Sequence, residues 1–227
     1  MSIHAEKIPQ QDVRLQRHIV HDSRSLAFPL EQVVDKSTWH TKSIRIYDPR
    51  PNPNQTVGNC TCCSKASQLN AVGNRRRGVV LDMKWAMNAY HVETGLDPFP
   101  GQYPGQDTGS NGLSSCKTAQ LLGVGGPYRW IFNGADGIVQ AIMSGLTPSV
   151  GTRWTEGMFN RDSDLVIRPT GADAGGHQYV YNRYDKARDL LGGLCWWGDD
   201  WRNFWIKRGA ANELVMDKGD SHVQARA

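Results

Sequence analysis

The stretch Asn54-Gln55-Thr56-Val57-Gly58-Asn59-Cys60-Thr61 joins a proline-rich segment to residues 60–72, which hold no glycine or proline and are typical of a short helix. The free N–H groups and the positive dipole end at a helix N-terminus favour a thiolate over a thiol at Cys60. Gln55 is near enough in sequence to donate an N–H to a developing oxyanion, which such donors stabilise by roughly 3 kcal/mol. Cys60 and Gln55 are therefore a candidate acyl-transfer pair, with a buried structural cysteine as the alternative.

The composition indicates a globular protein. The chain has 227 residues, 39% hydrophobic and 21% charged, enough for a proper core. Its net charge of +4 is a weak excess spread along the chain, so nucleic acid is not an expected partner. No run approaches the roughly 18 apolar residues of a membrane-spanning helix, so no membrane contact is expected. The first twenty residues hold no apolar run, which predicts a cytoplasmic protein without a secretory signal peptide.

The order of the predicted elements indicates an α+β protein. Residues 1–50 are polar and are expected to form an extension that wraps the domain, and the prolines of 48–54 exclude a helix there. Helices are predicted over 60–72, 79–92, 113–122 and 136–146, and strands over 150–154, 178–184 and 204–206. This order predicts two lobes, a helical one over about 55–133 and an antiparallel β lobe over about 134–220, with the site in the cleft between them.

Two further motifs lie in the second half of the chain. In Gly175-Gly176-His177-Gln178 the glycines permit close backbone approach and the histidine opens a predicted strand, where it can face a cleft as a general base. The alternative is an ordinary histidine at a strand end. The aromatic turn Cys195-Trp196-Trp197-Gly198 by itself indicates only packing.

Taken together and in this order, the motifs resemble the papain-like cysteine peptidases, whose nucleophile lies early, whose histidine lies late, and whose Asn-Ser-Trp-Gly segment follows it. Residues 107–112, which end in Asn111 and Gly112, resemble the glycine-rich segment that lines the peptide cleft of that family. Residues 21–25, 145–150 and 213–220 are similar to short papain-like proteins of bacteria and bacteriophages. The resemblance covers about residues 18–220. It implies a peptidase of the cytoplasm or of a virion, without a separate propeptide before Cys60.

The resemblance also implies roles for individual residues. Cys60 would attack a carbonyl of a peptide or protein substrate, Gln55 would hold the oxyanion, and His177 would protonate the leaving amine and then activate water. Asn111 and Gly112 would line the substrate cleft, and Trp197 would shield the imidazole. No metal and no organic cofactor is implied.

Two departures from the family pattern leave alternatives open. Gln55 and Cys60 are one residue closer than usual, so a second register with Cys63 as the nucleophile is possible, although we favour Cys60. The orienting asparagine is replaced by Cys195, a weak hydrogen-bond acceptor. Either activity is reduced, another group such as Asp199 or Asp200 orients His177, or the protein is a non-catalytic relative that binds peptides or serves a structural role.

Other readings of the same residues are weaker. Cys60, Cys62, Cys63, Cys116 and His177 supply soft ligands for zinc, but their spacing lacks a second matching pair. The odd count of five cysteines, three of which are close together at positions 60, 62 and 63, argues against a disulfide framework. A cell-wall amidase is a further alternative, because it would also use a Cys-His pair. The three arginines at residues 75–77 are typical of a solvated surface. The sequence does not give the substrate preference or the oligomeric state.

Overall fold

The computed structural model describes residues 5–6, 12–32, 34, 42–46, 52, 54–71 and 80–227. The α-helices are α1 (Cys60–Asn70), α2 (Met83–Leu96), α3 (Gly112–Leu121), α4 (Gly134–Met143) and α5 (Arg208–Lys218). The strands are β1 (Ala5–Glu6), β2 (Ile19–Val20), β3 (Ile44–Arg45), β4 (Gly125–Trp130), β5 (Ser149–Thr155), β6 (Asp173–Asp185), β7 (Leu190–Leu194), β8 (Phe204–Lys207) and β9 (Asp220–Arg226). Short 3-10 helices are η1 (Ser23–Ala27), η2 (Leu30–Gln32), η5 (Glu156–Phe159) and η6 (Asp199–Arg202). The arginine run at 75–77 and most of the proline segment at 48–53 lie outside the described residues.

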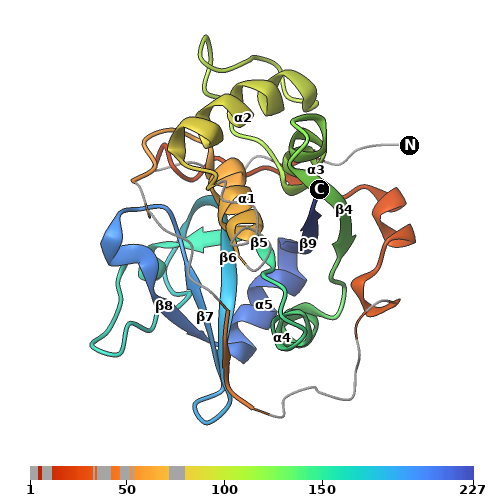
Figure 1. The fold of residues 1–227 in the computed structure, drawn as a ribbon. Helices are drawn as coiled ribbons and strands as arrows, with labels where there is room; N and C mark the ends of the chain where they lie inside the picture. The colour runs from red at the N-terminus through yellow and green to blue at the C-terminus, as the bar shows by residue number, and fades with distance from the viewer. Residues whose placement is uncertain are drawn as a thin grey trace.

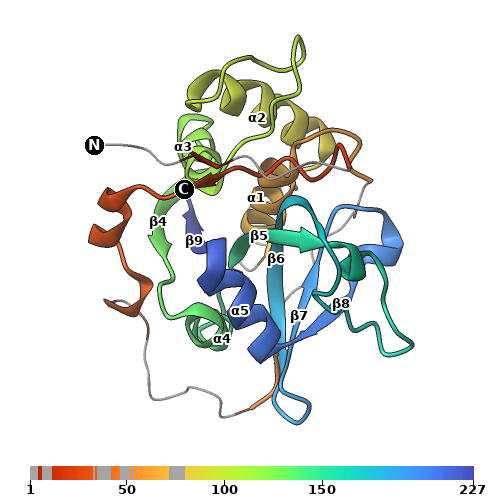
Figure 2. The ribbon, with the colours of Figure 1, turned by 180° about the vertical axis from the view of Figure 1, so that it is seen from behind.

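An antiparallel sheet of seven strands organises the fold. Its order is β4-β9-β5-β6-β7-β8, and β3 pairs with β6. Helix α1 packs over one face of this sheet, while α4 and α5 cover the other (Figures 1 and 2). Helices α2 and α3 pack against α1 beyond the sheet (Figure 1). The predicted α+β class with an antiparallel sheet is confirmed.

Helix α1 is buried along its whole length although its sequence is polar. A buried polar group is costly unless it is hydrogen-bonded, so α1 needs partners on every side. Thr61 Oγ1 and Cys62 Sγ both donate to the carboxylate of Glu93 on α2, at 2.8 and 2.7 Å. On the sheet side, Ser64 Oγ donates to the carbonyl of Tyr179 at 2.9 Å. These bonds fix α1, and the cysteine at its start, against both α2 and β6.

The predicted helices are found, and the boundaries of α2 and α4 differ most from those predicted. Helix α2 begins at Met83 rather than near residue 79, because the Asp82 side chain accepts a hydrogen bond from Trp85 N and caps the helix there. It also continues through Gly95, which therefore does not end it. The structure adds α5 and β9, which the sequence analysis did not predict. Strand β9 carries buried polar side chains such as His222 and Gln224 where an apolar alternation would be the usual signal.

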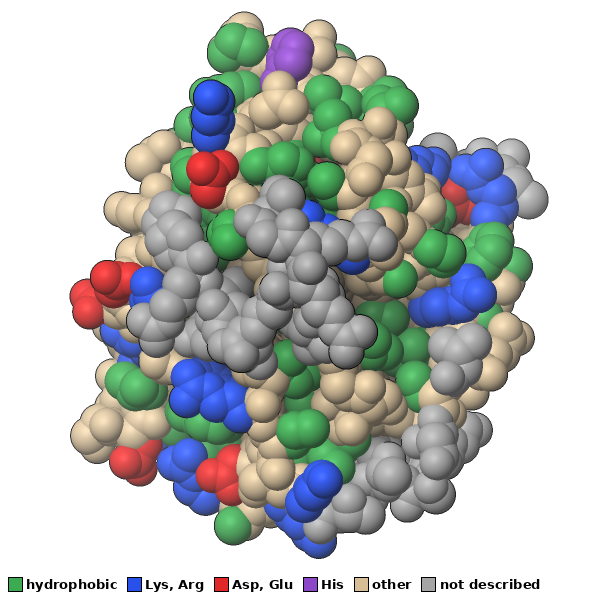
Figure 3. Space-filling view, in the orientation of Figure 1, with side chains coloured by type: hydrophobic (Ala, Val, Ile, Leu, Met, Phe, Trp, Pro, Cys, Tyr) green, Lys and Arg blue, Asp and Glu red, His purple; other side chains and the backbone are tan. Residues whose placement is uncertain are grey.

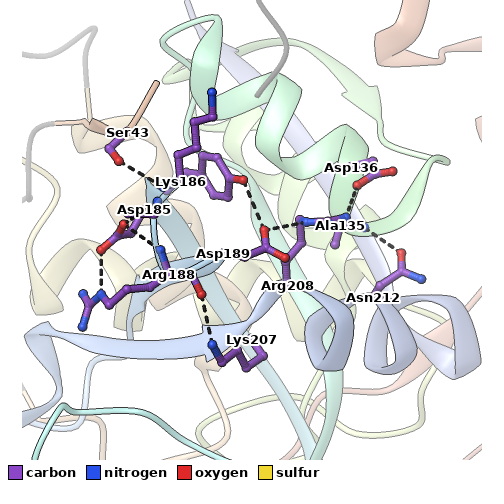
Figure 4. A network of polar contacts seen from close by, with 12 residues as sticks. Ser43, Ala135, Asp136, Asp185, Lys186, Arg188, Asp189, Lys207, Arg208 and Asn212 are labelled. Carbon is purple, nitrogen blue, oxygen red and sulfur yellow. Dashed lines mark hydrogen bonds and ion pairs between the residues drawn. The ribbon is translucent and has the colours of Figure 1, made fainter. Parts of the chain in front are cut away.

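A charged cluster ties α5 to α4 and to the turn between β6 and β7 (Figure 4). Arg208 donates to Asp136 at the start of α4 at 2.5 Å and to Asp189 in the turn at 2.8 Å. Asn212 Oδ1 accepts a hydrogen bond from Ala135 N at 3.1 Å. These side chains are partly exposed, so each contact contributes modestly, and their combined effect is to set the position of α5.

Lysine and arginine side chains are scattered among polar and apolar ones on the face shown in Figure 3. This distribution agrees with the weak overall charge excess and does not build a basic tract on that face among the described residues. That nucleic acid is not a partner stays a prediction.

Glu93 predicts a pH dependence of stability. Burial raises the pKa of Glu93 from 4.5 to about 7. Between these values the unfolded chain ionises while the folded protein keeps the proton, so the free energy of unfolding falls as pH rises and levels off above pH 7. Each pH unit in this window costs about 1.4 kcal/mol, and the whole window costs about 3 kcal/mol. Urea unfolding at pH 5 and pH 8 should show this loss as a change in the difference between wild type and Glu93→Gln, because the opposite contributions of the buried His177 and His222 are common to both proteins; an unchanged difference would contradict it.

Candidate active site

Cys60 is the first residue of α1 and is fully buried. Burial raises the pKa of its thiol to about 12, and the backbone N–H of Gln178 on β6 opposes this rise only in part. The expected thiolate is therefore wrong for this arrangement, because the loss of water outweighs the favourable helix N-terminus. Since Gln178 follows His177 directly, the thiol lies beside the part of β6 that carries the predicted histidine.

His177 lies in an aromatic box on the opposite side of β6 from Gln178. Its ring centroid is 4.5 Å from that of Trp197 and 5.2 Å from that of Trp154. Burial, together with the positive charge of Arg14, lowers the pKa of His177 to about 3. Both ring nitrogens are buried, no side chain among the described residues hydrogen-bonds to them, and the polar group of the cleft nearest to the ring is the backbone of Arg14. The imidazole is neutral, and the Trp197 ring lies against it; a role for Trp197 in shielding it or in binding substrate stays a prediction.

Gln55 is buried with its side chain directed at carbonyl oxygens. Its Nε2 donates to Val57 O at 2.7 Å and to Arg14 O at 3.2 Å. Its own backbone N–H donates to Trp196 O in the aromatic turn. The amide thus already holds a backbone carbonyl of an extended segment, the kind of group it is predicted to bind during catalysis.

The extended segment is residues 14–18, which we call the cleft segment. Arg17 N donates to Gly176 O at 3.0 Å, beside His177. On the other side, Ser110 N donates to Gln16 O at 3.2 Å and Ser110 O accepts from His18 N at 2.7 Å. Figure 2 shows this part of the chain passing between α2 and α3 on one side and β5 and β6 on the other. Part of the predicted wrapping extension therefore lies in the cleft itself.

The walls of the cleft are shaped to admit this segment. A Cβ at Gly109 would overlap the carbonyl oxygen of Gln16, and a Cβ at Gly176 would overlap that of Arg17. The Arg14 guanidinium stacks over the Trp197 ring with its carbon 4.4 Å from the ring centroid, and it pairs with Asp12 at 2.6 Å. The cleft segment thereby lies over the Trp197 ring that packs against the imidazole, and its Gln16 side chain lies against Gly58, two residues before Cys60.

The predicted substrate-binding residues lie close to this segment without pairing with it through their side chains. Asn111 caps α3, since its Oδ1 accepts from Ser114 N at 3.0 Å. Gly112 faces Asp220 and His222. A Cβ at position 112 would lie 3.4 Å or less from atoms of both side chains. The residue whose backbone pairs with the cleft segment is Ser110, directly before Asn111. The sequence analysis included Ser110 in residues 107–112, which were expected to line the cleft, but gave it no role of its own, because a backbone contact leaves no signal in the residue type.

Within the described part of the chain, no side chain takes the place of the orienting asparagine. Asp199 and Asp200 are exposed, and Asp199 pairs with Arg202 at 2.7 Å, so neither reaches back to the imidazole. Cys195 is buried, and burial raises the pKa of its thiol. The turn is instead held through its backbone by Asn52, whose Nδ2 donates to the carbonyls of Cys195 and Gly198 at 2.9 and 2.6 Å.

The remaining cysteines have structural surroundings. Cys63 Sγ donates to Asn59 Oδ1 at 3.4 Å and packs in the apolar cluster beneath α1, which favours Cys60 as the nucleophile. Cys116 accepts a hydrogen bond from Lys65 at 3.2 Å. All five cysteines are free thiols. Among the described residues no three or more His, Cys, Asp or Glu side chains are arranged to hold a metal ion.

Comparison with solved structures identifies the architecture. Xylellain, a cysteine protease from Xylella fastidiosa, superposes with a TM-score of 0.68 at 13% identity over 97% of this chain and 99% of its own. The chain has a papain-like fold. ProCathepsin B S9 from Trypanosoma congolense (TM-score 0.63, 13% identity, 94% of this chain and 87% of its own) and procathepsin L 3 of the Tenebrio molitor larval midgut (0.62, 12%, 95% and 76%) share this fold. No protein-family model and no curated protein matches the chain.

None of the described helices combines the length and apolar character needed to cross a bilayer.

The cover over Cys60 predicts slow alkylation. In the wild type, iodoacetamide should modify Cys60 slowly at pH 8, because the thiol is buried and protonated. Gly176→Ala places a Cβ against Arg17 O and displaces the cleft segment, so modification of Cys60 should become at least about tenfold faster. Gly209→Ala is the matched control, because a Cβ there meets nothing within 4 Å. Peptide mapping of the alkylated protein identifies the modified residue.

Two outcomes would contradict this prediction. Wild-type Cys60 that reacts as fast as in urea-unfolded protein would show that the segment gives no cover. Simultaneous modification of Cys62 and Cys63 in Gly176→Ala would show general unfolding instead of displacement.

Proposed function

We propose that the protein is a cysteine peptidase in which Cys60 is the nucleophile, His177 the general base and acid, and Gln55 the oxyanion donor. The observation that carries this proposal is the hydrogen bond from Gln55 Nε2 to the backbone carbonyl of Arg14 in the cleft. It is supported by the aromatic box around His177 and by the position of Cys60 at the start of α1. Peptides or proteins are the proposed substrates.

The reaction follows from these groups. The Cys60 proton passes to His177, and the sulfur attacks the carbonyl carbon of a peptide bond. The tetrahedral oxyanion is held by Gln55 Nε2 and by N–H groups at the start of α1. The imidazolium then gives its proton to the leaving amine, which leaves a thioester. A water molecule, deprotonated by His177, attacks this thioester and releases the acid and the free thiol.

The cleft segment has to leave before this chemistry begins. Its departure admits water to Cys60 and His177, so the pKa of the thiol falls and the pKa of the imidazole rises toward their ordinary values. Removing the positive charge of Arg14 raises the imidazole pKa further. The thiolate form of Cys60 and the imidazolium form of His177 can then both be populated near neutral pH.

A second function is favoured by one specific observation. Among the described residues, no side chain bonds to a ring nitrogen of His177 to fix its orientation. This supports a catalytically weak or inactive papain-like protein that grips a peptide in its cleft. Under either function, a cytoplasmic or virion location and the resemblance to bacterial and phage proteins stay predictions.

Cysteine variants separate these functions. Wild-type protein should hydrolyse a fluorogenic peptide, and Cys60→Ser should lower the rate by at least about a thousandfold because the attacking sulfur is lost. Cys63→Ser is the matched control and should keep most of the activity. A reversal of these two results would assign the reaction to Cys63.

An active-site-directed epoxide gives a second measurement. It should label Cys60 alone, and His177→Ala should lose that selectivity. Absence of both turnover and selective labelling, in the wild type and in Gly176→Ala, would overturn the peptidase in favour of the peptide-binding protein.

A further inference from the structure

A buried ion pair anchors the cleft segment. Arg17 Nη2 lies 2.5 Å from Asp220 Oδ2, and the Arg17 side chain is 0% exposed. Asp220 is the first residue of β9 and lies opposite Gly151 of β5 in the sheet. The carboxylate therefore belongs to the sheet, while the guanidinium is brought in by a segment that crosses the cleft.

The pocket around Arg17 is formed by the absence of side chains. A Cβ at Gly151 would overlap the Arg17 guanidinium, and the same position lies beside Gln178 Oε1. Gly112 leaves similar space next to Asp220 Oδ1. A long side chain that enters from the cleft thus meets a carboxylate and an amide oxygen at the end of a narrow passage.

The polar atoms of this pocket call for a cation. Asp220 Oδ1 and Gln178 Oε1 are both buried acceptors without a hydrogen-bond partner, and Arg17 uses only one of its donors on Asp220. A carboxylate in such dry surroundings is costly unless a positive charge lies beside it. When the cleft segment leaves, Asp220 and Gln178 remain in the pocket and an incoming chain has to supply that charge.

The pocket also lies beside the part of β6 that carries His177. The backbone N–H of Arg17 bonds to Gly176 O, and Gly176 directly precedes His177. A peptide that follows the same backbone bond would place its side chain in the pocket within a residue or two of the bond that is cut.

We propose that the Arg17 pocket is a substrate subsite that selects a basic side chain, with Asp220 as its specificity-determining residue. This inference rests on the proposed peptidase function. Arginine fits better than lysine, because its planar guanidinium bonds to Asp220 and keeps further donors beside Gln178 Oε1, although Arg17 itself makes no hydrogen bond to that oxygen. The cleft segment carries an arginine of its own, Arg17. This side chain fills the subsite and keeps a substrate side chain out of it.

Binding tests the subsite without any reaction. The full chain carrying Cys60→Ala and Arg17→Ala has an empty pocket, and the probes are acetyl-Leu-Arg-amide and its citrulline analogue, which has the same shape without the charge. Calorimetry should give at least tenfold tighter binding of the arginine probe. Adding Asp220→Asn should remove this difference, whereas Asp217→Asn, an exposed carboxylate near the same end of α5, should leave it intact. Equal binding of the two probes, or a preference that survives Asp220→Asn, overturns the proposal.

Hydrolysis by otherwise unaltered protein gives a second measurement, which does not depend on the folding of Arg17→Ala. The kcat/KM ratio for arginine over citrulline peptides should exceed tenfold in the wild type and approach one in Asp220→Asn. Displacement of the cleft segment is common to both substrates and cancels in this ratio. Turnover without an arginine preference overturns the subsite and leaves the peptidase. A binding preference without turnover overturns the peptidase and leaves the subsite.

Discussion

The complete burial of helix α1 is the constraint on which the site depends. A helix with this many polar side chains is stable inside a protein only if each finds a partner. Glu93 supplies partners from α2, and the carbonyl of Tyr179 supplies one from β6. These bonds cross from the helical part to the sheet, so they also fix where Cys60 lies. The position of the Cys60 thiol thus follows from the hydrogen bonds that the polar side chains of α1 make to α2 and β6.

The same burial sets the protonation states of the site. Water is excluded from Cys60 and His177, and each adopts its neutral form because the charged form loses more hydration than its neighbours restore. A proton transfer between them would create two charges in a dry site without a third group to orient the imidazole. The cleft therefore has to open for two reasons. A substrate must enter it, and water must reach Cys60 and His177 to stabilise the charges that the proton transfer creates.

Local chemistry in the sequence predicted the parts of the site that depend on local structure. The helix that begins at Cys60 is visible because a run without glycine or proline follows Gly58, and the strand that carries His177 is visible from the residues after Gly176, although β6 already begins at Asp173. Ser110 and Asp220 are not visible in this way. Ser110 acts through its backbone, and Asp220 acquires its partner only when β9 pairs with β5 and Arg17 crosses the cleft. Strand β9 itself escaped prediction because Ser221 and His222 are buried polar residues.

The tether between the cleft segment and the domain decides how the site can be used. A segment of the same chain competes with substrate at an effective concentration on the order of millimolar, so weak contacts suffice to keep it in place. Its backbone bonds to Ser110 and Gly176 are available to any peptide and give it no advantage over a substrate. The Arg17 to Asp220 contact is different, because only a chain with a basic side chain can replace it. A peptide without a basic side chain would have to displace the cleft segment and leave the buried Asp220 carboxylate unpaired. The Arg17 to Asp220 ion pair therefore holds the segment in the cleft and also selects which peptides can replace it.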